Sequence, residues 1–232
     1  MKNEKLKNSL VIFYITFSIL VFVIVLIIPV TREIFKDLST DYKYLMGFIK
    51  FALLATAGEL IAPIIAKGKI VVPVKIIWRF IIWGIIGVWI TFMMGVYKIA
   101  VGGIIDKDNT FLTAFLISVI MNTSFGPTFM ALHKCSDKIL ELSANKQKIS
   151  VNSVMGGIDW TTFASFTIGK TVPLFWIPAH TITFLLPAEY QVMMAAALSL
   201  ALGVFLSLAG RGKKAKAVET TSLKEEETKN AL

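Results

Sequence analysis

Residues 10–30 read LVIFYITFSILVFVIVLIIPV, a continuous and mostly apolar run without a single charged side chain. A helix needs about 20 predominantly apolar residues to cross the hydrocarbon core of a bilayer, and this run supplies them. Lys2, Lys5 and Lys7 precede it, as basic residues precede a secretory signal sequence. The run is too long for such a signal and no small-residue cleavage site follows it, so we expect a retained membrane-spanning helix.

Similar apolar runs recur along most of the chain. They predict an all-α, polytopic transmembrane helical bundle with about six spans, at residues 10–30, 48–66, 78–97, 111–132, 163–186 and 190–208. Hydrophobic residues make up 56% of the 232 residues, more than a soluble domain of this size can bury. We expect one membrane domain over residues 10–209, after a basic N-terminal segment at 1–9. The Lys-, Glu- and Thr-rich tail at 210–232 is typical of disorder.

The basic residues indicate the orientation of the bundle. The net charge is +9, and with a cytoplasmic N-terminus most lysines fall in loops on the cytoplasmic side. Both termini are therefore expected in the cytoplasm. The Ile/Lys-rich composition and the lack of a transit peptide favour the bacterial cytoplasmic membrane, as a multi-pass protein. The expected partner of these charges is the lipid bilayer and not nucleic acid, because no basic stripe alternates with exposed aromatic residues.

Two polar segments lie between the runs. Residues 31–43 mix apolar and charged side chains, which predicts a helix along the outer membrane interface. Residues 134–150 are expected either to extend the fourth span or to lie on the inner surface. Residues 187–189 alone separate the last two runs, so these should form an antiparallel hairpin.

Small residues recur at four-residue spacing within three predicted spans, which favours close helix packing in lipid. These candidate packing residues are Gly58, Ala62 and Ala66 in the second span, Gly87, Thr91 and Gly95 in the third, and Ala195, Ser199, Gly203 and Ser207 in the sixth. They can pack within one chain or between subunits of a homo-oligomer.

Charged residues at membrane depth are costly, so each is a functional candidate. Glu59 lies near the middle of the second span and must be protonated, paired or hydrated. Lys170, early in the fifth span, is its natural partner by charge. Alternatively, the flexible lysine stem reaches the headgroups.

The fifth span is the leading candidate for a pore or pocket lining. His180 shares a helix face with Trp176 and Thr183, and either lines a cavity or forms a structural hydrogen bond. Pro173 and Pro178 should bend the helix beside it.

The fourth span contains a second polar segment. Asn122 precedes the bendable pair Gly126-Pro127, which we treat as a candidate hinge. Asn122 is expected either to donate a hydrogen bond to a neighbouring helix or to line the same cavity as His180.

No motif of an enzyme, a nucleotide-binding loop or a cofactor site is present. Cys135 is the only cysteine, so no internal disulfide can form. His133 and Cys135 are too few for a zinc site. We expect no catalysis, no metal and no cofactor.

Three short patches resemble the Mpv-seventeen and twenty-two-kilodalton peroxisomal membrane protein family. They are Gly58-Glu59 with Lys67-Gly68, then Gly126-Pro127 with His133-Lys134 and Asp137, and then Trp176 with His180, Thr183, Phe184, Pro187 and Tyr190. The chain departs from the family pattern at His180 and Thr183, where the family has Gln and Asn. The family's Asp-Gln span is missing, and the apolar runs 10–30 and 78–97 are additional. The resemblance implies a small pore or metabolite-permeability protein of unspecified substrate.

These observations favour a channel-like or transporter-like membrane protein for an ion or small molecule. Bending at the two candidate hinges would gate it, and protonation of His180 would modulate it. Two alternatives stay open: a substrate-binding membrane subunit of an uptake transporter, and a membrane scaffold that transports nothing.

Overall fold

A computed structural model describes residues 2–105, 109–205 and 207–208, and the predicted tail at 210–232 lies outside them. All regular elements of the described residues are helices. Five of them are long and apolar enough to cross a membrane: α1 (Lys2–Ile27), α3 (Lys43–Lys67), α4 (Ile76–Gly102), α5 (Thr110–Ala144) and the C-terminal helix (Ala188–Phe205). The predicted class, an all-helical bundle compatible with a membrane, is confirmed.

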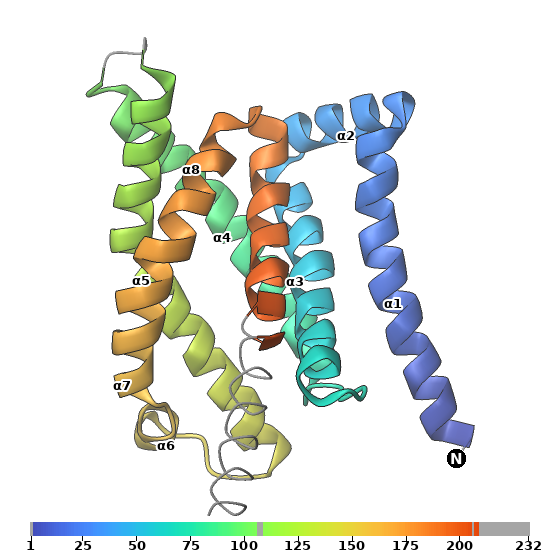
Figure 1. Ribbon diagram of the computed structural model, residues 1–232. Helices are drawn as coiled ribbons and strands as arrows, with labels where there is room; N and C mark the ends of the chain where they lie inside the picture. Colours follow the sequence, from blue (N-terminus) through green and yellow to red (C-terminus); the bar gives the residue numbers. More distant parts are fainter. Residues whose placement is uncertain (1, 106–108, 206, 209–232) are drawn as a thin grey trace, which may run out of the picture.

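The predicted fifth span folds as three consecutive helical elements. They are α7 (Trp160–Thr162), the π-helix η1 (Phe163–Trp176) and α8 (Ile177–Leu185), and together they run between the two ends of the bundle beside α5 (Figure 1). Pro173 lies inside η1 and Pro178 in the first turn of α8. π-Helical turns often occur where a helix has been adapted for function. The helix continues through Pro173 and Pro178 without a break, and its irregularity is a wider π-helical stretch that begins at Phe163.

The first helix ends earlier than the sequence predicted. Ile28 has extended backbone angles, φ −85° and ψ 119°, and Pro29 then begins α2 (Pro29–Asp41). Proline suits the first turn of a helix because its missing N–H would have no partner there. The predicted span at 10–30 is thus corrected: residues 29 and 30 belong to α2.

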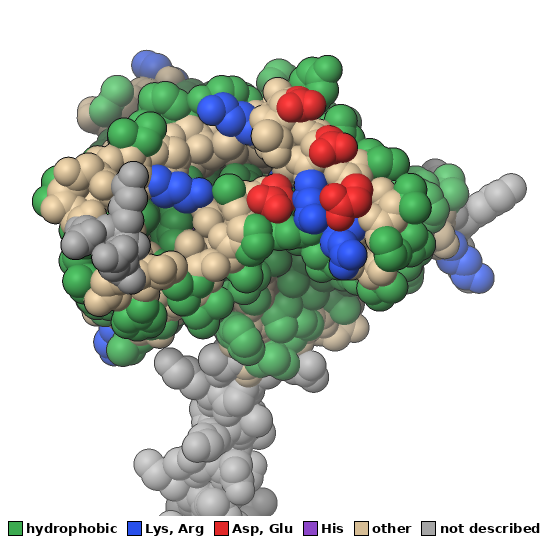
Figure 2. Space-filling model, turned by 90° about the horizontal axis from the view of Figure 1, so that it is seen from above, with side chains coloured by type: hydrophobic (Ala, Val, Ile, Leu, Met, Phe, Trp, Pro, Cys, Tyr) green, Lys and Arg blue, Asp and Glu red, His purple; other side chains and the backbone are tan. Residues whose placement is uncertain are grey.

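Helix α2 lies across the upper end of the bundle, roughly perpendicular to the long helices (Figure 1). Its buried Phe35 and Ser39 face the bundle, whereas Glu33 and Asp37 are exposed. Figure 2 shows this end from above, with acidic side chains gathered on one side among basic ones. The predicted amphipathic helix at 31–43 is present with the expected two-sided character.

Local signals explain where other helices begin and end. Asn109 caps α5 by accepting a hydrogen bond from the Leu112 amide at 3.0 Å. Gly68 ends α3 with a left-handed φ of 68°, which glycine adopts without strain. Helix α5 continues through Pro127 to Ala144. Residues 134–144 therefore extend the fourth predicted span, which was the first of the two alternatives for this segment.

Helix α3 is the most buried long helix, and its closest neighbour is α4. A Cβ atom added to Gly87 would overlap with the carbonyl oxygen of Gly47, so the two backbones touch at this pair. On the other side of α3, a Cβ at Gly58 would lie 3.0 Å from the Cα of Leu200 in the C-terminal helix. Phe51, between these contacts, is fully buried.

The loops lie at the two ends of the bundle. The N-terminus, the turn after α3, the segment around α6 (Val151–Gly156) and the last turns of the C-terminal helix all lie at the lower end in Figure 1. Helix α2 and the α8-to-C-terminal turn lie at the upper end. The two described ends of the chain therefore lie on one side of the bundle.

Candidate functional site

Helices α3, α4 and α5 bring together a cluster of charged side chains toward the lower end. Arg79 of α4 donates from Nη1 to Glu59 of α3, at 3.1 Å from Oε2, and to Asp137 of α5, at 2.7 Å from Oδ1. The side chains of Arg79 and Glu59 are 14% and 17% exposed, whereas Asp137 is 37% exposed. One guanidinium thus links carboxylates of two other helices. We call Glu59, Arg79 and Asp137 the ionic bridge.

Neighbouring groups fix the geometry of the ionic bridge. The indole Nε1 of Trp83 donates to Glu59 Oε1 at 2.8 Å, and Arg79 Nε donates to the carbonyl oxygen of Val74 at 3.0 Å. Trp83 lies one helical turn after Arg79, so both side chains project from the same face of α4. The carboxylate of Glu59 therefore accepts from two donors on α4, which satisfies its charge.

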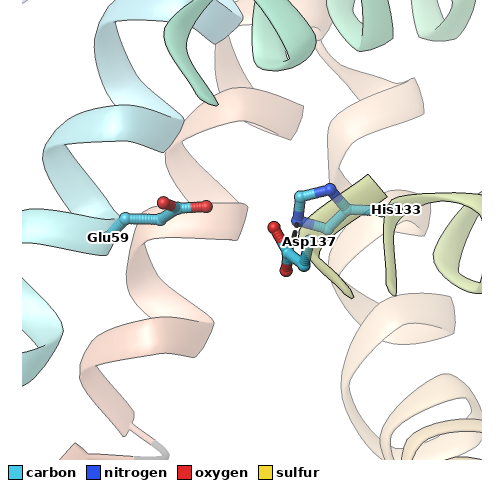
Figure 3. Close-up of side chains that lie close together, drawn as sticks. All are labelled: Glu59, His133 and Asp137. Atoms are coloured by element: carbon cyan, nitrogen blue, oxygen red, sulfur yellow. Dashed lines mark ion pairs between the residues drawn. The ribbon is translucent and has the colours of Figure 1, made fainter. Parts of the chain in front are cut away.

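His133 lies between the ionic bridge and the aromatic core. Its Nε2 is 3.7 Å from Asp137 Oδ2, and its ring packs on Trp83 with centroids 4.3 Å apart. Its Nδ1 is buried without a hydrogen-bond partner among the described residues. Figure 3 shows Glu59 of α3 pointing across the gap toward His133 and Asp137 of α5.

The same three side chains resemble a set of metal ligands. One ligand atom each from Glu59, His133 and Asp137 lies within 4.8 Å of the others, and carboxylates with imidazole suit several divalent ions. Arg79 nevertheless donates to both carboxylates, and its positive charge opposes a cation there. The arrangement as it stands is a network of ion pairs.

An open cleft adjoins the ionic bridge at the lower end of the bundle. Its volume is about 280 Å³, and its lining includes Arg79, Asp137, Lys138, Glu141 and Asp159. Hydrogen bonds from the Thr162 side chain and backbone hold the pKa of Asp159 below its usual value. The cleft thus presents mixed charges on the side of the ionic bridge that faces away from the aromatic core.

A second polar group lies higher in the bundle, between α5 and α8. His180 Nδ1 is 3.0 Å from Asn122 Oδ1, and Asn122 Nδ2 donates to the Ser118 carbonyl at 2.8 Å. Because the amide nitrogen of Asn122 already donates, its oxygen accepts from His180, and Nε2 of the neutral ring is then the acceptor. Ser118 Oγ in turn donates to the carbonyl oxygen of Ile177 at 2.7 Å. Asn122 therefore donates within its own helix and not to a neighbouring one, but it lines a cavity together with His180, which was the second expectation.

This cavity lies at the centre of the bundle. Its volume is about 40 Å³, which fits a water molecule. Asn122, Trp176, His180 and Ser199 are the polar residues of its lining, which also includes aromatic side chains such as Phe129. The Trp176 ring stacks on His180 with centroids 5.2 Å apart. We call this space the central cavity.

Aromatic residues of α5 connect the central cavity with the ionic bridge. Phe129 lines the cavity and stacks with His133, their centroids 6.5 Å apart. Asn122 and Asp137 are fifteen residues apart on α5, about 22 Å at 1.5 Å per residue. The two polar sites therefore lie one below the other along a single helix, separated by an aromatic layer.

The other predicted residues have different positions. Lys170 is exposed and Glu59 is paired with Arg79, so of the two alternatives for Lys170 the pairing with Glu59 is not found. Thr183 is fully buried and donates to Ala179 of its own helix, away from the cavity. Pro173 and Pro178 are exposed.

Only some of the candidate packing and hinge residues lie at close helix contacts or in the lining of the central cavity. Ala195 is buried and lines the central cavity with Ser199, and Ser207 donates to the carbonyl of Gly203 in its own helix. A Cβ atom at Gly95 would meet nothing within 4 Å, in contrast to Gly87. Gly126 is buried and also lines the central cavity.

Sequence reasoning missed Arg79, Trp83 and the role of Asp137. Arg79 falls within the predicted span at 78–97, so the rule that selected Glu59 also applied to it.

Comparisons with known proteins found no match for the chain among family models, curated proteins or solved structures.

Proposed function

We propose that the chain is a multi-pass membrane protein that lets a small polar solute cross the bilayer through the centre of this bundle. The observation that carries the proposal is Arg79 joining Glu59 and Asp137 from two other helices, below the central cavity. In this proposal the central cavity holds the solute and the ionic bridge is the gate at the lower end. Six membrane crossings and a bacterial cytoplasmic membrane, with the lower end in the cytoplasm, belong to the same proposal.

The chemistry of the two sites supports this division of roles. The cavity offers an amide, an imidazole, an indole and a hydroxyl, which are neutral groups that exchange hydrogen bonds with a polar solute. The ionic bridge exchanges its protein partners for water when α3, α4 and α5 separate, because its groups are only partly buried. The described conformation is closed, since Phe129, Trp83 and His133 fill the space between the two sites.

The family resemblance supports the proposal because residues of its three patches lie at the two polar sites. Its patches place Glu59, His133 and Asp137 in or beside the ionic bridge, and Trp176 and His180 in the central cavity. Membership in that family remains part of the proposal.

Flux in proteoliposomes tests the proposal with two variants of opposite expected effect. Glu59→Gln weakens the ionic bridge and should raise glycerol permeation, measured by stopped-flow light scattering. Ser199→Leu fills the central cavity and should abolish permeation. Ser207→Leu, two turns further along the same helix and away from the cavity, is the matched control.

Potassium conductance in planar bilayers, measured on the same proteins, separates an ion path from a path for neutral solutes. Wild-type permeation no faster than that of empty vesicles, for both glycerol and potassium, would overturn the proposal if the protein is monodisperse and helical. The binding subunit and the scaffold would then be the remaining functions.

A further inference from the structure

A large apolar groove, distinct from the central cavity, separates α1 from the C-terminal helix. Its volume is about 630 Å³, within the range of about 300–1,000 Å³ that ligand pockets have. Phe22 and Leu26 form one wall, and Met194, Ala197 and Leu200 form the other. The only charged side chain in its lining is Arg32, at the start of α2.

Helix α2, which carries Arg32, has a fixed position at the upper end of the groove. Helix α2 is fastened to the bundle by the buried ammonium of Lys50, which donates to Ser39 at 2.8 Å and lies 4.3 Å above the Phe35 ring. Phe35 also stacks on Tyr190 of the C-terminal helix, with centroids 5.9 Å apart. The helix that carries Arg32 therefore has a fixed position across the top of both walls (Figure 1).

The charge of Arg32 has no carboxylate partner among the described residues. Its neighbour Glu33 pairs with Lys36 at 2.9 Å, and Arg32 takes part in none of the ion pairs of this part of the chain. A guanidinium at the membrane interface matches the geometry of a phosphate, which it binds through two parallel hydrogen bonds.

The length of the groove matches one leaflet of a bilayer. Its wall on the C-terminal helix extends from Tyr190 to Leu200, about 15 Å at 1.5 Å per residue. Half of the hydrocarbon core measures about 15 Å. An acyl chain that starts below Arg32 can therefore lie in the groove along its whole length.

We propose that this groove is a specific phospholipid site, with the phosphate on Arg32 and an acyl chain between α1 and the C-terminal helix. The acidic side chains on the same face (Figure 2) favour a zwitterionic headgroup, whose ammonium they attract. The bound lipid fills the space between α1 and the remaining helices and so fixes the position of α1. This role is independent of solute permeation through the central cavity.

Native mass spectrometry of the purified full chain tests the site, with added phosphatidylethanolamine and with diacylglycerol of the same acyl chains. Wild-type protein should retain one phosphatidylethanolamine and little diacylglycerol. Arg32→Gln should weaken phospholipid retention about tenfold, the effect of losing a charge-assisted hydrogen bond. Lys43→Gln, an exposed cation outside the groove lining, should retain the lipid like wild type.

A second variant, Ala197→Phe, fills the groove without changing its charge and should also lose the lipid. The proposal would be overturned if wild type, Arg32→Gln, Lys43→Gln and Ala197→Phe all retained both lipids equally. The groove would then be covered only by nonspecifically bound lipid. The proposal would also be overturned if the wild-type chain were a dimer that Ala197→Phe dissociates and that neither Arg32→Gln nor the lipid phosphate affects. The groove would then be occupied by a second copy of the chain.

Discussion

Arg79→Gln is the most informative single substitution, because it leaves two carboxylates without their shared cation. Removing one partner of a fully buried ion pair costs about 3–5 kcal/mol. Arg79 and Glu59 are 14% and 17% exposed and Asp137 is 37% exposed, so water screens part of that loss. We expect the free energy of unfolding to fall by about 2–3 kcal/mol.

The melting temperature should fall accordingly. For a chain of 150–250 residues, 1 kcal/mol corresponds to about 2–4 °C, so Arg79→Gln should lower Tm by about 4–12 °C. Glu59→Gln should lower it less, because Arg79 then keeps Asp137 and the amide still accepts from Trp83. The double variant should lose less than the sum of both changes, since no unpaired carboxylate is then left at position 59.

The chain contains its own reporter for this measurement. Cys135 is the only cysteine, is partly buried, and lies two residues before Asp137 in α5. A fluorogenic thiol reagent on detergent-solubilised protein therefore follows the opening of this region, and far-UV circular dichroism follows the whole bundle. Lys69→Gln, an exposed lysine in the turn after α3, is the control. If Arg79→Gln melts at the same temperature as Lys69→Gln, the ionic bridge does not stabilise the bundle and cannot be the gate. The same conclusion holds if the losses of stability of Arg79→Gln and Glu59→Gln simply add in the double variant, because the two residues are then not coupled.

Three further outcomes follow from the described contacts. Gly87→Ala should lower Tm by several degrees in the same melting assay, whereas Gly95→Ala should leave it unchanged or slightly raised, because only the first new Cβ atom overlaps with a neighbouring backbone. Asn122→Ala should cost about 1–3 kcal/mol, since it removes the acceptor of the buried His180 ring; denaturant unfolding against Asn122→Asp would measure the loss. The cap at Asp159 should be pH-dependent: its pKa is lowered on folding, so the stabilisation is complete above the unfolded pKa and is lost as pH falls through the folded value. Amide exchange of the capped turn should show this loss in wild type, and Asp159→Asn should remove the pH dependence.

The hydrophobic pattern was enough to predict most of the architecture. Runs such as residues 10–30 must form helices in lipid because each backbone group needs a partner within its own segment. The interfacial helix at 31–43 also followed from local composition. Its exact start at Pro29 was missed although a local signal was present, because a proline disfavours the helical conformation of the residue before it, here Ile28.

The candidate site divides in the same way. Glu59, Asn122 and His180 could be selected from the sequence, because a polar residue inside an apolar run is conspicuous wherever it packs. Their partners could not be selected so easily. Arg79 joins Glu59 and Asp137 across separations of 20 and 58 residues, which no local pattern encodes.

Charge alone offered Lys170 as one partner of Glu59, beside the alternative that its stem reaches the headgroups, and the structure placed that lysine on the exposed surface. The sequence by itself determined which segments become membrane-compatible helices, since hydrophobicity and helix formation are local properties. Which side chains meet between those helices was decided only by the tertiary structure, through close backbone contacts such as Gly47 with Gly87 that set how each helix is turned toward its neighbours.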